Sequence, residues 1–235
     1  MKANTDLLIQ EAKKNAALQA IKHVKDNFIV GLGSGTTVAF AIEALGKRVK
    51  EEKLRVMGIP SSYQAFQLAI QQGIQITTLD EHPIIDITID GADQITPKLD
   101  LIKGMGAALV REKIVATASK YNIIIVDKSK RVNVLGENNQ AVPIEVLPFA
   151  LSLVKNKIAD LGGNPVVREG KGKLGPIITD NGNMIIDANF GLIQNPQDLA
   201  IKVKNIPGVV ETGFFVDLTN IAYIATENRV EQLQK

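Results

Sequence analysis

Apolar residues along this chain follow two alternating patterns. In one they form short continuous runs, typical of strands buried in a sheet; in the other they recur every three or four positions, typical of helices with one buried face. The helical spacing predicts helices over residues 6–25, 36–47, 63–72, 107–120, 149–161 and 196–205. The apolar runs predict strands over residues 28–30, 54–57, 74–77, 84–89, 123–126, 144–147, 166–169, 177–179, 184–187, 209–215 and 221–225.

The order of these elements divides the chain into two regions. Strands and helices alternate in the first region, which predicts a parallel sheet with helices on both faces. In the second, the order is close to strand, helix, strand, strand, helix, strand, with Asn181-Gly182 as a hairpin turn. We therefore expect an α/β protein with a large Rossmann-like domain of residues 1–136 and 216–235. A smaller, ferredoxin-like α+β domain of residues 137–215 is inserted before the last strand of the large domain's sheet.

Composition narrows the classes of function. The 235 residues are 45% hydrophobic and 22% charged, which suits a globular core. Cysteine is absent and the two histidines, His23 and His82, are far apart, so we expect neither thiolate chemistry nor a metal site. The net charge of +2, without a basic stretch rich in aromatics, gives no reason to expect a nucleic-acid partner. No apolar segment has the length of a membrane span or the pattern of a signal peptide, so we expect a cytoplasmic protein without a membrane partner.

The glycine-rich segment Gly31–Thr37 stands between a predicted strand and a predicted helix. Glycines allow a close approach to backbone N–H groups, and a helix start attracts anions, so Ser34, Gly35, Thr36 and Thr37 suit a phosphate group. A dinucleotide fits less well, because Thr36 stands where the Gly-x-Gly-x-x-Gly pattern needs glycine. The alternative is a purely structural turn with a threonine helix cap.

Charged residues also follow other predicted strands. Asp90-Gly91-Ala92-Asp93 comes at the end of strand 84–89, and two neighbouring carboxylates suit proton transfer. The structural alternative is an Asp-Gly turn in which Asp93 caps a short helix. Lys130 follows strand 123–126, where either it or Lys128 could point toward the same edge of the sheet.

The segment Lys103–Lys113 combines a lysine, a glycine-containing loop and a helix start. On the predicted helix Glu112 flanks the apolar stripe next to small residues, which leaves space above its carboxylate. The alternative is a solvated glutamate paired with a lysine. Arg111 projects within the apolar stripe, and we expect it to be a structural ion-pair member.

These segments, with Pro143–Val146, Thr179–Asn183 and Ile206–Val210, together resemble ribose-5-phosphate isomerases of the A type over essentially the whole chain. The resemblance implies Glu112 as the general base, Asp90 and Asp93 as an acidic pair that assists ring opening, and Lys103 beside the reacting oxygens. It implies a substrate-binding set of Ser34, Gly35, Thr36, Thr37, Asp90, Gly91, Ala92, Asp93, Lys103, Gly104, Met105, Gly106 and Lys130. The family commonly has glycine where Met105 stands, so a positive φ at this position would strain the methionine.

The same resemblance implies interconversion of ribose 5-phosphate and ribulose 5-phosphate through a cis-enediolate, a step of the non-oxidative pentose phosphate pathway. It implies no metal or organic cofactor, and a homodimer or homotetramer. The main alternative is a non-enzymatic sugar-phosphate sensor, which would have no need of Glu112. An acyl-CoA transferase of related architecture would need a larger chain or a second subunit for its coenzyme.

Overall fold

The computed structural model describes residues 2–170, 172 and 174–235, and the chain divides into two compact units. Unit 1 consists of Met1–Ala92, Arg111–Arg131 and Asp217–Lys235. Unit 2 consists of Asp93–Val110 and Val132–Val216. The chain therefore passes from one unit to the other at four peptide bonds, after residues 92, 110, 131 and 216.

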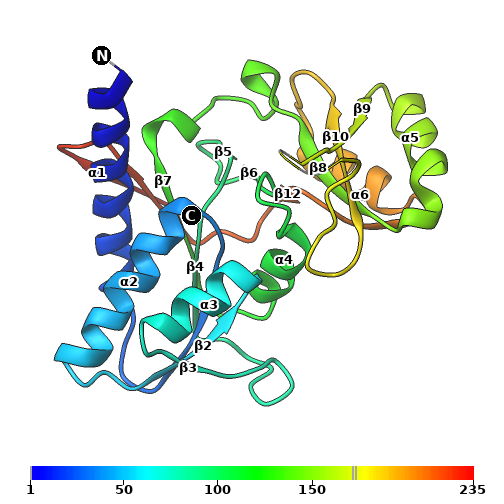
Figure 1. Ribbon diagram of the computed structural model, residues 1–235. Coiled ribbons are helices and arrows are strands. Elements are labelled where there is room, and N and C mark those ends of the chain that lie inside the picture. The colour runs from blue at the N-terminus through cyan, green and yellow to red at the C-terminus, as the bar shows by residue number, and fades with distance from the viewer. Residues whose placement is uncertain (1, 171, 173) are drawn as a thin grey trace. The chain divides into compact units, whose positions relative to one another are not determined.

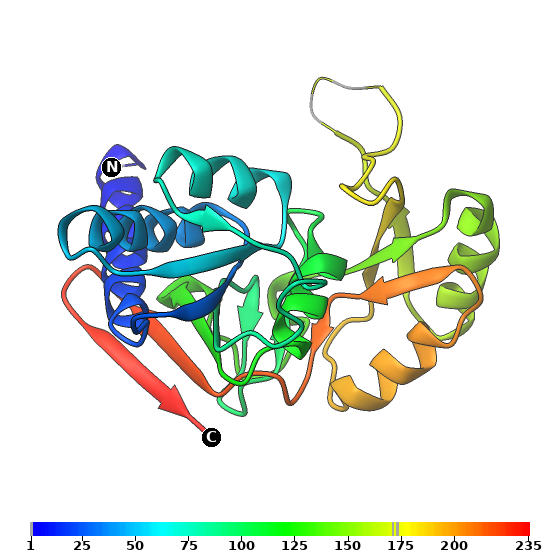
Figure 2. The ribbon, with the colours of Figure 1, turned by 90° about the horizontal axis from the view of Figure 1, so that it is seen from below.

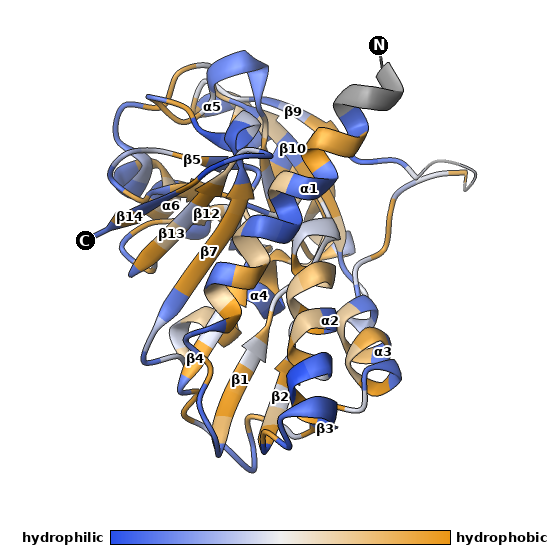
Figure 3. Ribbon diagram, turned by 90° about the vertical axis from the view of Figure 1, so that its left-hand side faces the viewer, coloured by the Kyte–Doolittle hydropathy of each residue, from blue (hydrophilic) through white to orange (hydrophobic). Residues whose placement is uncertain are grey.

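Unit 1 is built on a seven-stranded sheet in the order β14-β13-β7-β4-β1-β2-β3. Neighbouring strands pair in parallel, except that β14 pairs antiparallel with β13 at one edge. The central strands are strongly apolar, as expected for a parallel sheet covered on both faces (Figure 3). The strands are β1 (Phe28–Leu32), β2 (Val56–Pro60), β3 (Gln75–Ile76), β4 (Ile87–Asp90), β7 (Asn122–Asp127), β13 (Ile221–Ala225) and β14 (Val230–Gln234).

Helices cover both faces of this sheet, as the alternating pattern predicts (Figures 1 and 2). One face carries α1 (Lys2–Ile21), α2 (Thr36–Glu51) and α3 (Tyr63–Gln71), whose apolar residues share a core with alternate strand residues such as Val30. The other face carries α4 (Leu109–Thr117), where Val115 packs with Ile29. Since successive side chains of a strand point to opposite faces, the neighbours Ile29 and Val30 of β1 enter these two different cores.

Glycine in β1 lets α4 lie directly on the sheet. A Cβ atom at Gly31 would lie 1.9 Å from Thr88 Oγ1 and 2.6 Å from Val115 Cγ1. At the other end of α4, Ser119 forms a parallel bridge with Ile85, just before β4 begins. The helix thus runs antiparallel to the strands, and its first turn lies toward the carboxyl ends of β1 and β4.

Two predicted elements of unit 1 are shorter than their patterns suggest. The helix over residues 107–120 begins only at Leu109, because Ala107 has a left-handed φ of +58°. The strand over residues 84–89 begins at Ile87, since Ile84 is exposed and Ile85 forms only the isolated bridge. The edge strand β14 was not predicted, because its sequence Val-Glu-Gln-Leu-Gln is largely polar.

Unit 2 contains a four-stranded antiparallel sheet in the order β11-β8-β10-β9. In chain order its elements are β8 (Val142–Val146), α5 (Leu151–Asp160), β9 (Asn164–Val167), β10 (Met184–Asn189), α6 (Pro196–Lys204) and β11 (Val209–Thr212). Both helices pack on one face of the sheet, where Ile144 and Ile186 share a core with Val154 and Val203 (Figure 2). This is the ferredoxin-like arrangement expected from the sequence. Residues 177–179 form only an isolated bridge, Ile178 with Met184, and not a strand.

A second, three-stranded sheet of unit 2 was not predicted. It consists of β5 (Gln94–Ile95), β6 (Leu101–Ile102) and β12 (Phe214–Phe215), in the order β12-β6-β5. The predicted strand over residues 209–215 therefore divides between two sheets, with Gly213 between the parts. This pairing also explains why residues 93–110 group with unit 2, whereas the predicted domain limits place them in the large domain.

Among the described residues, no helix has both the length and the apolar character needed to cross a membrane.

Candidate functional site

In unit 1 the predicted acidic residue Asp90 lies at the carboxyl end of β4, beside the glycine turn that follows β1. Its side chain is 3% exposed. Asp90 Oδ1 accepts hydrogen bonds from the backbone N–H groups of Ser34 (3.2 Å) and Gly91 (2.7 Å). A Cβ atom at Gly33 would lie 2.1 Å from the same oxygen. The glycine at position 33 is therefore what allows the carboxylate to lie against the turn.

Replacing Gly33 by alanine should displace Asp90 and destabilise the protein. Overpacking of this kind costs about 1–3 kcal/mol in the free energy of unfolding, measured in urea. Gly91→Ala is the matched control, because a Cβ atom there would meet nothing closer than 3.8 Å. Equal stability of the Gly33→Ala variant and the wild type would show that the turn can move away from Asp90.

The turn before α2 gathers hydroxyl groups from two strands. Ser34 Oγ lies 2.8 Å from Ser61 Oγ and 2.7 Å from Ser62 Oγ, and Ser62 in turn caps α3. The backbone N–H of Gly35 donates to Gln64 Oε1 at 3.0 Å. No sequence pattern singles out Ser61, Ser62 or Gln64, because they belong to a different strand-to-helix turn.

The start of α2 fits an anion better than it fits a structural cap. The N-cap residue is Gly35, at a φ of +105°, and no side chain caps the helix, so the alternative of a threonine cap is wrong. Thr36 Oγ1 instead accepts a hydrogen bond of 3.0 Å from Lys13 Nζ of α1. A helix start with a lysine ammonium beside it is a positively charged position. Nothing in the sequence pattern marks Lys13 as part of this group.

Glu112 lies in the first turn of α4 and is only 5% exposed. The alternative of a solvated glutamate is therefore wrong. Glu112 precedes Val115 by one helical turn on the same side of α4, and Val115 contacts the sheet at Gly31. Because α4 runs antiparallel to the strands, Glu112 lies toward the end of the sheet that carries Ser34 and Asp90. Glu112 and the glycine turn therefore lie toward the same end of the sheet of unit 1.

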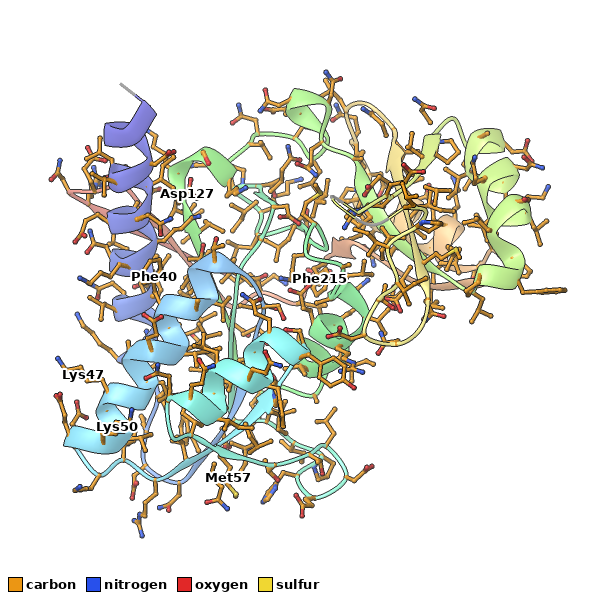
Figure 4. The ribbon with its side chains drawn as sticks, in the orientation of Figure 1. Phe40, Lys47, Lys50, Met57, Asp127 and Phe215 are labelled. Atoms are coloured by element: carbon orange, nitrogen blue, oxygen red, sulfur yellow. The ribbon has the colours of Figure 1, made fainter. Side chains whose placement is uncertain are left out.

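Two further cations of unit 1 have defined places. Arg111 is half-buried, with its guanidinium carbon 5.2 Å from the centroid of the Tyr63 ring. Its expected ion pairing stays a prediction. Lys130 ends a 3-10 turn (Lys128–Lys130) that follows β7 and is capped by Asp127, which is labelled in Figure 4. Lys130 is half-buried whereas Lys128 is exposed, so Lys130 is the more enclosed of the two lysines.

In unit 2, Lys103 follows β6 and is 3% exposed. Its ammonium lies 5.3 Å from the centroid of the Phe215 ring, also labelled in Figure 4, and its backbone N–H donates to the carbonyl of Gly213 at 2.9 Å. A buried ammonium held against an aromatic face is shielded from water, so it attracts a nearby negative charge more strongly than a solvated surface lysine does.

The loop after Lys103 is shaped by Gly104 and Ala107. Both have left-handed φ values, +108° and +58°, whereas Met105 does not have a positive φ. The methionine is therefore not strained, and its side chain is 52% exposed. The Met105 N–H donates to Asp93 Oδ2 at 2.9 Å. Asp93 leads into β5 and does not cap a helix, so the capping alternative is wrong.

Comparison with known proteins identifies the family of this chain. The sequence model of the family described as ribose 5-phosphate isomerase A (phosphoriboisomerase A) matches residues 57–229. The chain belongs to this family. Ribose-5-phosphate isomerase A of Methanosarcina acetivorans is 46% identical over 216 residues, which cover 92% of this chain and 91% of that protein. Ribose-5-phosphate isomerase A of Pyrococcus abyssi is 42% identical, with 97% and 99% of the two chains covered.

Solved structures of ribose-5-phosphate isomerases have the same fold. The enzyme of Methanocaldococcus jannaschii has a TM-score of 0.91 at 44% identity, covering 95% of this chain and 98% of that one. A D-ribose-5-phosphate isomerase solved in complex with phospho-erythronic acid has a TM-score of 0.94 at 42% identity, covering 97% and 99%. This family membership makes the chain an isomerase with the expected α/β fold, and it sets aside the sensor alternative.

No group of three or more histidine, cysteine, aspartate or glutamate side chains arranged to hold a metal ion occurs among the residues that the structure describes. The expectation that no cofactor is needed stays a prediction.

Proposed function

We propose that this chain interconverts ribose 5-phosphate and ribulose 5-phosphate, with Glu112 as the base that moves the proton. The observation that carries the proposal is the burial of Glu112 in the first turn of α4, toward the end of the sheet where the glycine turn and Asp90 lie. A carboxylate largely excluded from water, toward the end of the sheet where α2 begins with an anion-attracting turn, suits proton transfer on a phosphorylated sugar. The names of the relatives, and the phospho-erythronic acid bound to one of them, support the same substrate class.

The proposed reaction moves one hydrogen between neighbouring carbons. Glu112 removes the proton from C2 of the open-chain aldose, which gives a cis-enediolate, and returns it to C1. The proton of the C2 hydroxyl passes to the oxygen on C1, so that C2 becomes the carbonyl carbon of the ketose. Lys103, with backbone N–H groups of the loop at Gly104 and Gly106, stabilises the negative charge on the enediolate oxygens. Asp90 and Asp93 assist opening of the sugar ring by moving a hydroxyl proton. Because only protons move, the proposed reaction needs neither an electron acceptor nor a metal ion.

The phosphate end of the substrate is proposed to bind at the start of α2. The segment Ser34, Gly35, Thr36 and Thr37 would surround the phosphate, with the hydroxyls and N–H groups of Thr36 and Thr37 as the main donors, because the N–H groups of Ser34 and Gly35 already donate to Asp90 and Gln64. Lys13 adds a positive charge through its position at Thr36. Gly91, Ala92, Met105 and Lys130 complete the proposed set of substrate contacts. Anchoring the phosphate fixes which carbon lies over Glu112 and so contributes to the rate by orientation.

The direct test is to incubate the purified protein with ribose 5-phosphate and to measure ketose formation with EDTA present and no nucleotide added. We expect turnover that does not change with the chelator. Absence of ketose from a folded sample would overturn the proposal.

Replacing Thr36 and Thr37 together by valine should raise KM about tenfold or more and change kcat little, because hydrogen bonds to a charged group contribute about 1.5–3 kcal/mol each. Lys47→Ala at the opposite end of α2 is the control, since Lys47 is 71% exposed. A loss confined to kcat would contradict the anchoring role.

We further propose that the protein acts in the cytoplasm as a homodimer or homotetramer, as the resemblance to its family implies. Light scattering after size-exclusion chromatography gives the mass directly. A mass of 25.4 kDa, that of one chain, would refute the oligomer.

A further inference from the structure

Arg168, directly after β9, is an interior cation that the proposed mechanism does not use. Its side chain is only 9% exposed and forms an ion pair with Asp187 of β10, in which Nε donates to Asp187 Oδ2 at 2.7 Å and Nη2 to Oδ1. The two residues come from paired strands, since Val166 is opposite Asp187 and the Arg168 N–H donates to the carbonyl of Ile185. The guanidinium is thereby fixed by its own sheet before it contacts anything else.

The remaining nitrogen of Arg168 is directed at the loop after Lys103. Nη1 donates to the carbonyl oxygens of two consecutive residues, Gly104 at 2.9 Å and Met105 at 3.0 Å. Nη2 also lies 3.8 Å from the sulfur of Met105. One guanidinium thus links a strand of the antiparallel sheet to the backbone of the loop that the proposed reaction relies on.

The peptide group between Gly104 and Met105 is held at both ends. Arg168 binds its carbonyl oxygen, and Asp93 Oδ2 accepts a hydrogen bond from its N–H at 2.9 Å. Its orientation depends on Gly104, which has a φ of +108° and no room for a side chain, because a Cβ atom there would lie 2.8 Å from Leu109. A cation on one side and a carboxylate on the other therefore prevent this peptide from rotating.

The second carbonyl bond fixes the following peptide group as well. In a trans peptide the N–H points opposite to the carbonyl oxygen. Because Arg168 holds the carbonyl of Met105, the N–H of Gly106 points away from the guanidinium. One guanidinium holds the Asp187 carboxylate with Nε and Nη2 while Nη1 holds both carbonyls, whereas an ammonium group is a compact point charge without a fixed fork.

We propose that Arg168 is a positioning residue for the isomerase reaction: held by Asp187, it fixes the loop Lys103–Gly106 so that Lys103 and the loop N–H groups are aligned for the enediolate. This inference rests on the proposed function. Arg168 itself contacts loop carbonyls and not substrate. Arg168 holds the loop in its reactive conformation before the reaction begins, so no free energy is spent on ordering the loop in the transition state. Loss of Arg168 therefore lowers kcat and leaves the affinity for the phosphate end of the substrate unchanged.

The test compares Arg168→Lys with Arg55→Lys. The control removes the guanidinium of an exposed arginine that pairs with Asp26. We expect Arg168→Lys to lower kcat about 10- to 100-fold, since misplacement of a reacting group by about 1 Å costs up to that much, with KM within about threefold of the wild type. Asp187→Asn should have a smaller effect in the same direction. Arg55→Lys should leave both constants unchanged.

Two inhibitors separate loop alignment from phosphate binding. Phospho-erythronic acid carries a carboxylate where the reacting oxygens would lie, and inorganic phosphate has only the phosphate group. Inhibition by the acid should weaken in Arg168→Lys by about the factor lost in kcat, while inhibition by phosphate is unchanged. In Arg168→Ala, added guanidinium chloride at low millimolar concentration should restore part of kcat, and an equal concentration of sodium chloride should not.

These outcomes also separate the two proposals. If the wild type does not isomerise ribose 5-phosphate, the proposed function fails. If the wild type is active but Arg168→Lys keeps kcat within twofold, or if kcat falls only in proportion to the folded fraction measured by thermal unfolding, the positioning role is overturned and Arg168 serves stability alone.

Discussion

Glu112→Gln is expected to lower kcat for ribose 5-phosphate by about 10²–10⁴-fold or more and to change KM little, because glutamine keeps the size of the side chain but cannot accept a proton. Glu112 is 5% exposed, so bulk water has little access to the position and cannot take over as the base. The amide occupies the same volume in the first turn of α4, and we expect the variant to fold. Initial rates of ketose formation over a range of substrate concentrations give both constants.

A second measurement isolates the proton transfer itself. In deuterated water the wild type should exchange the C2 hydrogen of the substrate with solvent while it isomerises, and Glu112→Gln should lose this exchange together with turnover, as followed by NMR. Glu43→Gln on α2 is the control, because Glu43 is exposed. Near-normal turnover of Glu112→Gln would remove Glu112 from the role of base.

Lys103→Met is expected to lower kcat by about 10²–10³-fold, the typical loss when one group that stabilises an oxyanion is removed. Lys103 is 3% exposed, and its ammonium lies against the ring of Phe215. Methionine has a similar length and avoids the desolvation of a charge, so the fold should be retained. The effect then reports the loss of the cation and not the loss of packing.

The control for Lys103→Met is Lys98→Met, since Lys98 is exposed and lies between β5 and β6 of the same unit. Steady-state rates and thermal unfolding are measured for both variants. A kcat within threefold of the wild type for a folded Lys103→Met protein would show that the ammonium does not face the developing charge.

The α/β fold could be predicted from the sequence because both types of sheet leave local signals. Short continuous apolar runs mark the buried parallel strands, and the Asn181-Gly182 turn precedes β10 of the antiparallel sheet. The three-stranded sheet leaves no such signal. Each of its strands has two residues, and β12 pairs with β6 across more than a hundred positions, as Phe214 does with Ile102. Such pairing depends on the whole fold and not on a local pattern.

The resemblance to the family pointed to Lys103, because β6, the strand before it, was not predicted. Asp90 was predictable, because its charge follows a predicted buried strand. Lys13 was not, since a lysine on a helix is normally solvated, and only the packing of α1 next to α2 brings it to Thr36. Arg168 was missed for the same reason: its function depends on which backbone carbonyls its guanidinium meets. Met105 illustrates the reverse case, because a departure from the family pattern proves harmless once Gly104 and Ala107 are seen to take the left-handed conformations.

The four passages of the chain between the two units have a practical consequence for recombination. Three of these passages, after residues 92, 110 and 131, fall within two residues of Asp93, Glu112 and Lys130. A chimera that takes one unit from this chain and the other from a relative must therefore be spliced beside the proposed reacting groups. Crossover libraries of this fold should retain activity best when their junctions fall inside helices such as α2 or α5, remote in sequence from those three junctions.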